Sequence, residues 1–350
     1  MSNKSDRMKV KGQSRVVVVV RVVVVVVVVV VGLLSGGGAL FAQNGKGGGR
    51  PDYAIAIHGG AGVILKQNLS DELEARYMHV LDSVLSIGEG ILKAGGTALD
   101  AAEQVVRAME DCPLFNAGKG AVFTHEGHNE LDAAIMDGSN LMAGAVASVR
   151  NVKNPISLAR AVMSRSKHVM LSGEGAVEFA REQGLEIVDD SYFYTERRWN
   201  DLQRAIARDE QGKTGTVGCV VLDRHGNLAA ATSTGGMTNK RWNRIGDTPI
   251  IGAGNYASNA SCAVSGTGHG EYFIRYTVAR EIAALMEYKN LSARQAAEEV
   301  VMKRLKPAGG EAGVIVLDKD GRVAMVFNSP GMYRAMADSH GKREVAIFEK

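Results

Sequence analysis

The sequence predicts an α+β fold, and three observations support this prediction. From Tyr53 onward, segments with apolar residues at helical spacing are mixed with short apolar runs typical of strands. The chain has 350 residues, of which 45% are hydrophobic, so it can bury a large core. Its 42 glycines indicate many tight turns and places where the backbone approaches another group closely.

The first 42 residues differ from the rest of the chain. A basic leader is followed by a valine-rich run interrupted by Arg21, then by a glycine run and the segment Ala-Leu-Phe-Ala at 39–42. This order is typical of a secretory signal peptide, whereas a membrane anchor requires about 20 uninterrupted apolar residues. We therefore expect a signal peptide at 1–42, a folded domain at 52–350, and a periplasmic or secreted protein. If the segment is not a signal, the expected location is cytoplasmic.

The composition of the remaining chain argues against several functions. After residue 42 there are 35 Lys and Arg against 37 Asp and Glu, with no long basic stripe, so no nucleic acid partner is expected. Cys112, Cys219 and Cys262 are odd in number and widely spaced. They suggest neither a disulfide framework nor a zinc site.

The N-terminal half predicts strands and helices in a definite order. An apolar run at 54–57 predicts a strand that ends in His-Gly-Gly-Ala-Gly (58–62). Residues 71–93 carry apolar residues at helical spacing, and Thr97 caps a second helix that reaches about Glu110. Strands are then expected between 121 and 149. Helices at 156–164, 174–183 and 196–208 precede an exposed polar loop at 209–215.

The C-terminal half contains one hairpin pattern twice. Residues 217–223 and 228–232 predict a β-hairpin, and the pattern G-x-x-G-x-x-V-L-D-x-x-G, which starts at Gly215, returns 95 residues later at Gly310. The second copy has Glu311 in the place of Thr216. The glycines, the strand and the aspartate therefore belong to the hairpin, and Thr216 is a feature that the hairpin does not require. A helix is expected at about 272–288.

A threonine directly behind a glycine has its own chemistry. Its hydroxyl is a poor nucleophile unless a base removes the proton. If the chain is cut between Gly215 and Thr216, the threonine gains a free α-amine with a reference pKa of about 7.7–8.0, which can act as that base. Gly215 suits such a cut because a residue without Cβ tolerates strained backbone. The simpler alternative is that Thr216 only begins a strand, where threonine is common.

Three polar segments after the hairpin strengthen the catalytic interpretation. Residues 232–240 are dense in hydroxyls and glycines. Arg244 and Asp247 form an opposite-charge pair around a glycine. In Ser-Gly-Thr-Gly-His-Gly-Glu (265–271), Thr267 and Gly268 precede the expected helix and can direct a hydroxyl and backbone N–H groups at an anion.

These segments together resemble one family, the plant-type L-asparaginase/isoaspartyl peptidases, which are N-terminal nucleophile hydrolases. The resemblance covers nearly the whole chain after the leader. It is carried by AIAIHGGAG (54–62), CPLFNAGKGAVFT (112–124), ELDAAIMDG (130–138), GTVG (215–218), ATSTGGMTNK (231–240), GDTPIIGAGNYA (246–257) and GTGHGE (266–271). It implies a four-layer αββα sandwich. It also implies a precursor that is cut into an α chain (43–215) and a β chain (216–350).

The resemblance implies a role for each matching residue. Thr216 is the expected nucleophile, freed by cleavage after Gly215, and Thr234 beside it is expected to hold the nucleophile and its amine. The expected oxyanion hole comprises Thr267 and Gly268. Substrate binding is expected to involve Arg244 for the α-carboxylate, Asp247 for the α-amino group and the backbone of Gly270, and Asn116 is expected to assist processing.

The resemblance also implies an ion, a partner and a reaction. A structural sodium ion is expected in the loop 109–119, held by main-chain carbonyls, with no cofactor for catalysis; the loop residues are Met109, Glu110, Cys112, Phe115, Ala117 and Lys119. The expected assembly is an (αβ)2 heterotetramer acting on small molecules. The expected reaction is hydrolysis of L-asparagine or β-aspartyl peptides through a β-aspartyl enzyme. The alternatives are a glycosylasparaginase and an exported, non-enzymatic binding protein for aspartate-like ligands.

Overall fold

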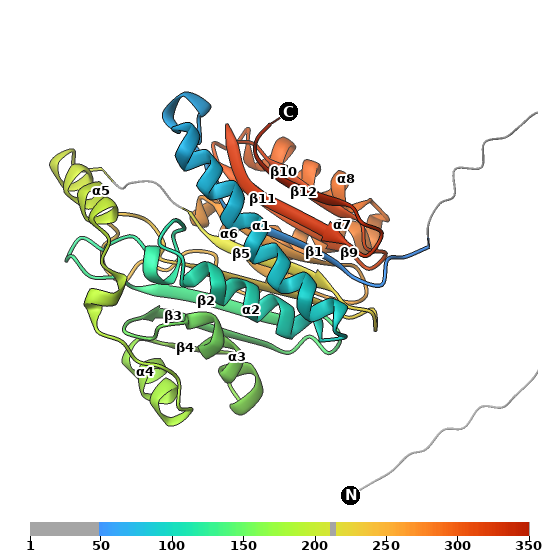
Figure 1. Cartoon of the computed structure of the whole chain (residues 1–350), viewed down its shortest axis with the longest axis horizontal. Coiled ribbons are helices and arrows are strands. Elements are labelled where there is room, and N and C mark those ends of the chain that lie inside the picture. Colours follow the sequence, from blue (N-terminus) through green and yellow to red (C-terminus); the bar gives the residue numbers. More distant parts are fainter. Residues whose placement is uncertain (1–48, 211–214, 350) are drawn as a thin grey trace, which may run out of the picture. The chain divides into compact units, whose positions relative to one another are not determined.

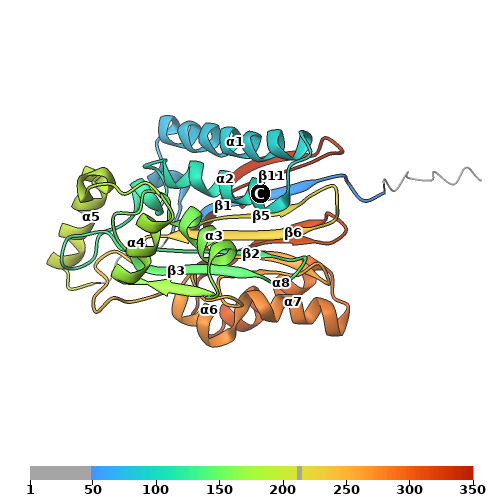
Figure 2. The same cartoon turned by 90° about the horizontal axis from the view of Figure 1, so that it is seen from below.

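Two β-sheets lie face to face between two layers of helices (Figures 1 and 2). The computed structural model describes residues 49–210 and 215–349, which belong to the compact unit Gly48–Lys350. The predicted signal peptide at 1–42 lies outside the described residues. The layers follow the order helix, sheet, sheet, helix. The α+β class and the αββα sandwich are therefore confirmed.

The larger sheet has eight strands in the order β12-β11-β1-β5-β6-β2-β3-β4. All neighbours are antiparallel except β3 and β4. The strands are β1 (Ala54–Gly62), β2 (Leu131–Asp137), β3 (Ala143–Val149), β4 (Met170–Ser172), β5 (Val217–Leu222), β6 (Leu228–Thr234), β11 (Gly331–Asp338) and β12 (Arg343–Phe348).

The smaller sheet has four antiparallel strands in the order β10-β9-β8-β7. They are β7 (Asn255–Ala257), β8 (Cys262–Gly268), β9 (Ala312–Asp318) and β10 (Val323–Phe327). The two predicted hairpins are both present, as β5–β6 and β9–β10. They share a sequence pattern but lie in different sheets. Thr216 directly precedes the first hairpin, whereas Glu311 precedes the second.

The helices are divided between the two outer faces (Figure 2). The larger sheet is covered by α1 (Asp71–Lys93), α2 (Ala98–Glu110) and α3 (Pro155–Arg165), and the smaller one by α7 (Val278–Lys289) and α8 (Ala293–Val300). The remaining helical segments are α4 (Gly173–Glu182), α5 (Glu196–Ala207), α6 (Gly270–Tyr276) and the short turns η1 (Lys66–Asn68), η2 (Gly118–Gly120), η3 (Asp190–Phe193) and η4 (Val301–Leu305). Among the described residues, no helix has the length and apolar character needed to cross a membrane.

Side-chain alternation along β1 explains how one strand serves two cores. Ile55 and Ile57 pack under α1 and α2, while Ala54 and Ala56 face the smaller sheet. The layer between the sheets is rich in alanine, which lets the two sheets approach closely. Thr97 caps α2 as predicted, because its side chain accepts a hydrogen bond from the N–H of Asp100 at 3.1 Å.

The helix predicted at 272–288 is wrong in one respect, because it is interrupted at Thr277. This residue has a left-handed backbone (φ 45°), and α6 ends there before α7 begins. The N–H groups of Ala279 and Arg280 donate to the carbonyls of Ala253 and Gly252 instead of continuing the helix. Apolar spacing alone does not reveal that a distant loop takes these donors.

Candidate active site

Thr216 lies directly before β5, near the centre of the larger sheet. Strand β5 is flanked by β1 and β6, so the residue that precedes it is held between neighbours on both sides. The side chain is buried, with 5% of the residue exposed. The hydroxyl Oγ1 of Thr216 donates to Oγ1 of Thr234, the last residue of β6, at 3.3 Å. The structure thus brings together two threonines that are 18 residues apart in the chain.

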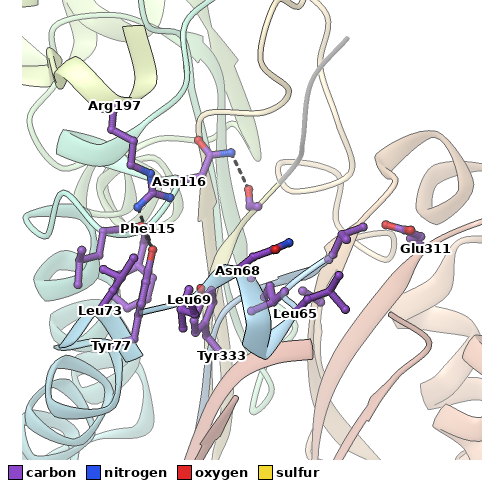
Figure 3. A pocket seen from close by; sticks show the side chains of 18 of the residues that line it. Leu65, Asn68, Leu69, Leu73, Tyr77, Phe115, Asn116, Arg197, Glu311 and Tyr333 are labelled. Carbon is purple, nitrogen blue, oxygen red and sulfur yellow. Dashed lines mark hydrogen bonds between the residues drawn. The ribbon is translucent and has the colours of Figure 1, made fainter. Parts of the chain in front are cut away.

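The carbonyl oxygen of Gly215 receives two hydrogen bonds. Asn116 donates from Nδ2 at 2.8 Å, and Thr234 donates from Oγ1 at 2.7 Å. A dashed line marks the bond from Asn116 in Figure 3. The N–H of Gly236 in turn donates to Oγ1 of Thr234 at 3.0 Å. Two donors directed at one peptide carbonyl polarise it and stabilise negative charge that develops on its oxygen.

Asn116 is held in place through every polar atom of its amide group. Its Nδ2 also donates to the carbonyl of Gly236 at 2.8 Å, and its Oδ1 accepts from the N–H of Val122 at 2.9 Å. With the bond to Gly215, both N–H donors and the carbonyl acceptor are used. The side chain can therefore adopt few other orientations.

A buried chain of polar side chains lies beneath Thr216, between the two sheets. His58 Nδ1 is 3.1 Å from the carbonyl oxygen of Thr216, and Nε2 is 2.9 Å from Ser265 Oγ. Ser265 Oγ is 2.7 Å from Thr232 Oγ1, which accepts from Asn255 Nδ2 at 2.9 Å. Burial lowers the pKa of His58 to about 3, so the ring is neutral at physiological pH.

Two glycines are required beside this group of polar side chains, Gly218 by close packing and Gly60 by its backbone conformation. A Cβ at Gly218 would lie 1.9 Å from Ser265 Oγ and 2.3 Å from His58 Nε2, so no side chain fits there. Gly60 has φ +110°, and a Cβ on it would lie 3.5 Å from the backbone nitrogen of Thr216. The glycines of the HGGAG segment and of the hairpin thus allow the backbone to approach the threonine.

Thr267 and Gly268 lie at the end of β8, on the smaller sheet. Thr267 is fully buried, and its Oγ1 accepts a hydrogen bond from the N–H of Ala61 at 3.4 Å. Thr267 shares a strand face with Ser265, two residues earlier. Ser265 is one of the buried polar side chains beneath Thr216 and lies next to His58. Gly268 has φ +142°, and a Cβ there would lie 2.3 Å from the carbonyl of Glu311, so only glycine fits.

Comparison with known proteins agrees with this geometry. A family model described as asparaginase matches residues 51–347. The chain belongs to this family. An isoaspartyl peptidase of Salmonella typhimurium is 53% identical over 293 residues, 80% of this chain and 94% of the relative, and one of Escherichia coli is 52% identical, covering 80% and 91%. A probable isoaspartyl peptidase/L-asparaginase 2 of Arabidopsis thaliana is 43% identical over 327 residues, 85% and 99% of the two chains. As a member, the chain is a hydrolase with the N-terminal nucleophile fold.

Arg244 and Asp247 meet at Gly270 in this asparaginase-family chain. A Cβ at Gly270 would lie 2.7 Å from Arg244 Nη2 and 2.9 Å from Asp247 Oδ1, so the space in front of both charges is kept open by a glycine. Arg244 does not pair with Asp247. It makes a bidentate ion pair with Glu271, at 2.8 Å from Nε and 2.9 Å from Nη2.

Asp247 is buried without full pairing. Its Oδ2 has no hydrogen-bond partner, and 5% of the residue is exposed. Burial raises the pKa of this carboxyl to about 7, although nearby Arg244 lowers it. A buried, unpartnered carboxylate oxygen is costly unless a cation from a ligand meets it.

In the loop 109–119, where a sodium ion is expected, two main-chain oxygens lie close to glycines. A Cβ at Gly118 would lie 2.4 Å from the carbonyl oxygen of Glu110, and one at Gly120 would lie 2.1 Å from that of Phe115. Carbonyl oxygens suit a hard cation, so these residues fit the expected ion. The side chain of Lys119 leaves the loop, with Nζ 5.2 Å from the centre of the Tyr192 ring. Among the described residues, His, Cys, Asp and Glu side chains form no group that could hold a metal.

The sequence predicts no role for the buried polar side chains under Thr216. In the sequence, His58 stands at the end of a predicted strand, and Ser265 and Thr232 belong to hydroxyl-rich segments. His58 and Ser265 are 207 residues apart. No signal in the sequence distinguishes these residues, because the glycine of the hairpin occurs in both copies, as Gly218 and Gly313, and only the fold shows that the first meets a histidine.

Proposed function

We propose that this asparaginase-family chain is an isoaspartyl peptidase and L-asparaginase that activates itself by cutting the bond between Gly215 and Thr216. The relatives described above carry these activities in their names. The observation that carries the proposal is the carbonyl of Gly215, which accepts hydrogen bonds from both Asn116 and Thr234 while the hydroxyl of Thr216 contacts Thr234. An ordinary strand entry needs no such arrangement.

The proposed cut is an internal acyl shift. Thr216 Oγ1 attacks the carbonyl carbon of Gly215, and its proton passes to Thr234 Oγ1 as the proton of Thr234 moves toward the new oxyanion. Asn116 Nδ2 stabilises that oxyanion. Collapse breaks the C–N bond, the nitrogen takes a proton and becomes the α-amine, and water hydrolyses the resulting ester. The products are the α chain, ending in Gly215, and the β chain, beginning with Thr216.

The freed threonine then acts on substrate. Its α-amine takes the hydroxyl proton, and Oγ1 attacks the side-chain carbonyl of asparagine or of a β-aspartyl residue. Thr267 and the N–H of Gly268 would hold the oxyanion. Arg244 would bind the α-carboxylate and Asp247 the α-ammonium, on either side of Gly270. The leaving amine takes the proton, and water releases aspartate from the threonine ester.

Several further expectations belong to this proposal. We propose that a sodium ion in the loop 109–119, bound by main-chain carbonyls such as those of Glu110 and Phe115, stabilises the loop that carries Asn116. We also propose an (αβ)2 assembly and export through the leader at 1–42. The alternative glycosylasparaginase would release a glycan-bearing amine. The apolar side chains beside Gly215, described below, favour a peptide instead.

The decisive experiment analyses the purified full chain. A denaturing gel and intact mass should give two fragments, the smaller beginning at Thr216. Thr216→Ala should remain uncut and inactive, whereas Thr216→Ser, which keeps a hydroxyl, should still be cut, more slowly. Arg244→Ala should be cut but should bind β-aspartyl dipeptides poorly, with a raised KM. A wild-type chain that hydrolyses β-Asp-Leu yet stays in one piece after long incubation would contradict self-activation.

A further inference from the structure

A pocket of about 540 Å³ opens beside Gly215 (Figure 3). Its size lies within the range of small-molecule sites. It is lined by Gly60, Asn116 and Gly215, which surround the scissile bond, but not by Arg244, Asp247 or Gly270. The pocket therefore adjoins the bond before Thr216, and its lining does not include the residues proposed to bind the aspartyl group.

One wall of this pocket is apolar. Side chains that flank η1 line it together with Phe115 and with side chains from the first half of α1 and from β11; they are Leu65, Leu69, Leu73, Tyr77 and Tyr333. Tyr77 and Tyr333 stack with ring centres 4.1 Å apart, which gives the wall a fixed shape. Such a surface suits an apolar side chain and offers a sugar few hydrogen-bonding partners.

Arg197 of α5 supplies an unpaired cation to the same pocket. Its Nη1 donates to the hydroxyl of Tyr77 at 3.0 Å, and that hydroxyl donates to the carbonyl of Leu114 at 3.1 Å. No carboxylate among the described residues lies within 4.0 Å of Arg197. Its neighbour Arg198, by contrast, is occupied by the carbonyl of Gly120 at 2.8 Å and by Asp201 at 3.9 Å.

The opposite wall carries a negative charge. Glu311 and His269 line it, and Figure 3 shows Glu311 on the other side of the pocket from Arg197. A ligand carboxylate is therefore repelled at one end and attracted at the other. Arg197 has planar N–H donors that suit a carboxylate, so the charges set the direction in which an anionic ligand enters.

We propose that this pocket is the leaving-group subsite, which binds an amino acid with an apolar side chain through a pair between its free carboxylate and Arg197. The inference rests on the proposed function. A β-aspartyl dipeptide bound through Arg244 and Asp247 would extend its C-terminal residue past Thr216 into this space. Asparagine releases only ammonia and does not reach Arg197. The subsite thus selects dipeptides with an apolar C-terminal residue over other β-aspartyl compounds.

The test compares substrates that differ only at the leaving group. Wild-type enzyme should prefer β-Asp-Leu over β-Asp-Gly and over β-Asp-Leu amide, whose carboxylate is capped. Arg197→Met should raise the KM for β-Asp-Leu about five- to tenfold and remove the preference for the free acid over the amide. Arg197→Lys should keep part of that preference. Arg204→Met, on the same helix but paired with Asp201 at the surface, is the matched control and should change no substrate preference.

The outcomes separate the subsite from the proposed function. The subsite is wrong if Arg197→Met still prefers the free acid over the amide. It is also wrong if that variant loses activity on asparagine and on both peptides equally, because Arg197 then only supports Tyr77. Wild-type enzyme that hydrolyses asparagine but not β-Asp-Leu would also overturn the subsite. Failure of the wild-type enzyme on every substrate would instead overturn the proposed function.

Discussion

At the scale of single residues, the carbonyl of Thr216 fixes the direction of the buried polar chain. A carbonyl only accepts, so His58 Nδ1 must carry the proton and Nε2 must accept from the hydroxyl of Ser265. Ser265 then accepts from Thr232, which accepts from Asn255. Once the bond before Thr216 is cut, that residue becomes a chain end, and the bond from His58 remains one of the contacts that hold its backbone.

Two substitutions of His58 distinguish positioning from packing. The amide nitrogen of asparagine lies where Nδ1 does, whereas that of glutamine lies where Nε2 does. His58→Asn should therefore keep the bond to Thr216 and lose the bond to Ser265. In His58→Gln the bond to Thr216 is lost, and the amide nitrogen, which only donates, can meet Ser265 Oγ only through a bond of the opposite direction. Both should lower the melting temperature, because each leaves a buried partner unpaired at a cost of about 1–3 kcal/mol. We expect kcat to fall about tenfold further in His58→Gln than in His58→Asn, with similar KM values. Equal kcat values would show that these buried polar side chains only pack the core.

Asp247 predicts a pH dependence of substrate binding. With a pKa near 7, the carboxyl takes up a proton as the pH falls below that value and no longer attracts an ammonium group. The α-amine of Thr216, with a reference pKa of about 7.7–8.0, is also protonated as the pH falls and can then no longer act as the base. The logarithm of kcat/KM should therefore fall with a slope approaching two at acid pH. Asp247→Asn should have lower activity and a slope of one, and a slope of two in that variant would exclude Asp247 as the titrating group.

At the scale of elements, helix α1 depends on a glycine to approach the sheet. Gly88 faces β1 and α2, and a Cβ there would lie 2.4 Å from Ile55 Cδ1 and 2.8 Å from Val105 Cγ2. Gly90, two residues later, is exposed and has no atom within 4 Å of the position of a Cβ. The same helix thus contains one glycine that packing requires and one that it does not.

These two glycines make a matched pair for alanine substitution. Gly90→Ala should stabilise the protein by about 0.5–1 kcal/mol, because alanine favours the helix. Gly88→Ala gains the same preference but must displace Ile55 and Val105, so a net loss of about 1–2 kcal/mol is expected. Urea unfolding of both variants in the uncut Thr216→Ala background measures the difference. Equal free energies of unfolding would show that α1 shifts without cost.

How far the sequence predicts each element depends on whether its cause is local. The helix at 71–93 follows from periodicity, and the cap at Thr97 follows from residue type. The break at Thr277 does not, because the acceptors that cause it lie in the loop at 252–253. The same distinction applies to the site. The sequence predicts Thr216 and Arg244 as site residues. It does not predict the ion pair of Arg244 with Glu271 or the position of Arg197 in the pocket beside Gly215, because these depend on the fold.

At the scale of the whole molecule, the proposed cut separates strands that alternate within one sheet. In the large sheet, β1 of the α chain lies between β11 and β5 of the β chain, and β2 of the α chain pairs with β6. The core between the sheets also combines both chains, with Ala54 and Ala56 against Ile315 and Leu317. Neither fragment therefore has a complete core of its own.

This interleaving predicts that cleavage leaves the assembly intact. Separating the fragments requires breaking the ladders on both sides of β1 and exposing buried apolar surface, which is a large part of the unfolding cost. The cut enzyme should elute in native size-exclusion chromatography as one species that contains both fragments. Its elution volume should equal that of the uncut Thr216→Ala control. Its mass should be that of (αβ)2 if the proposed pairing is right. The fragments should separate only at denaturant concentrations that unfold the control. Fragments that elute apart in native buffer would mean that the strands are not held in this order after cleavage.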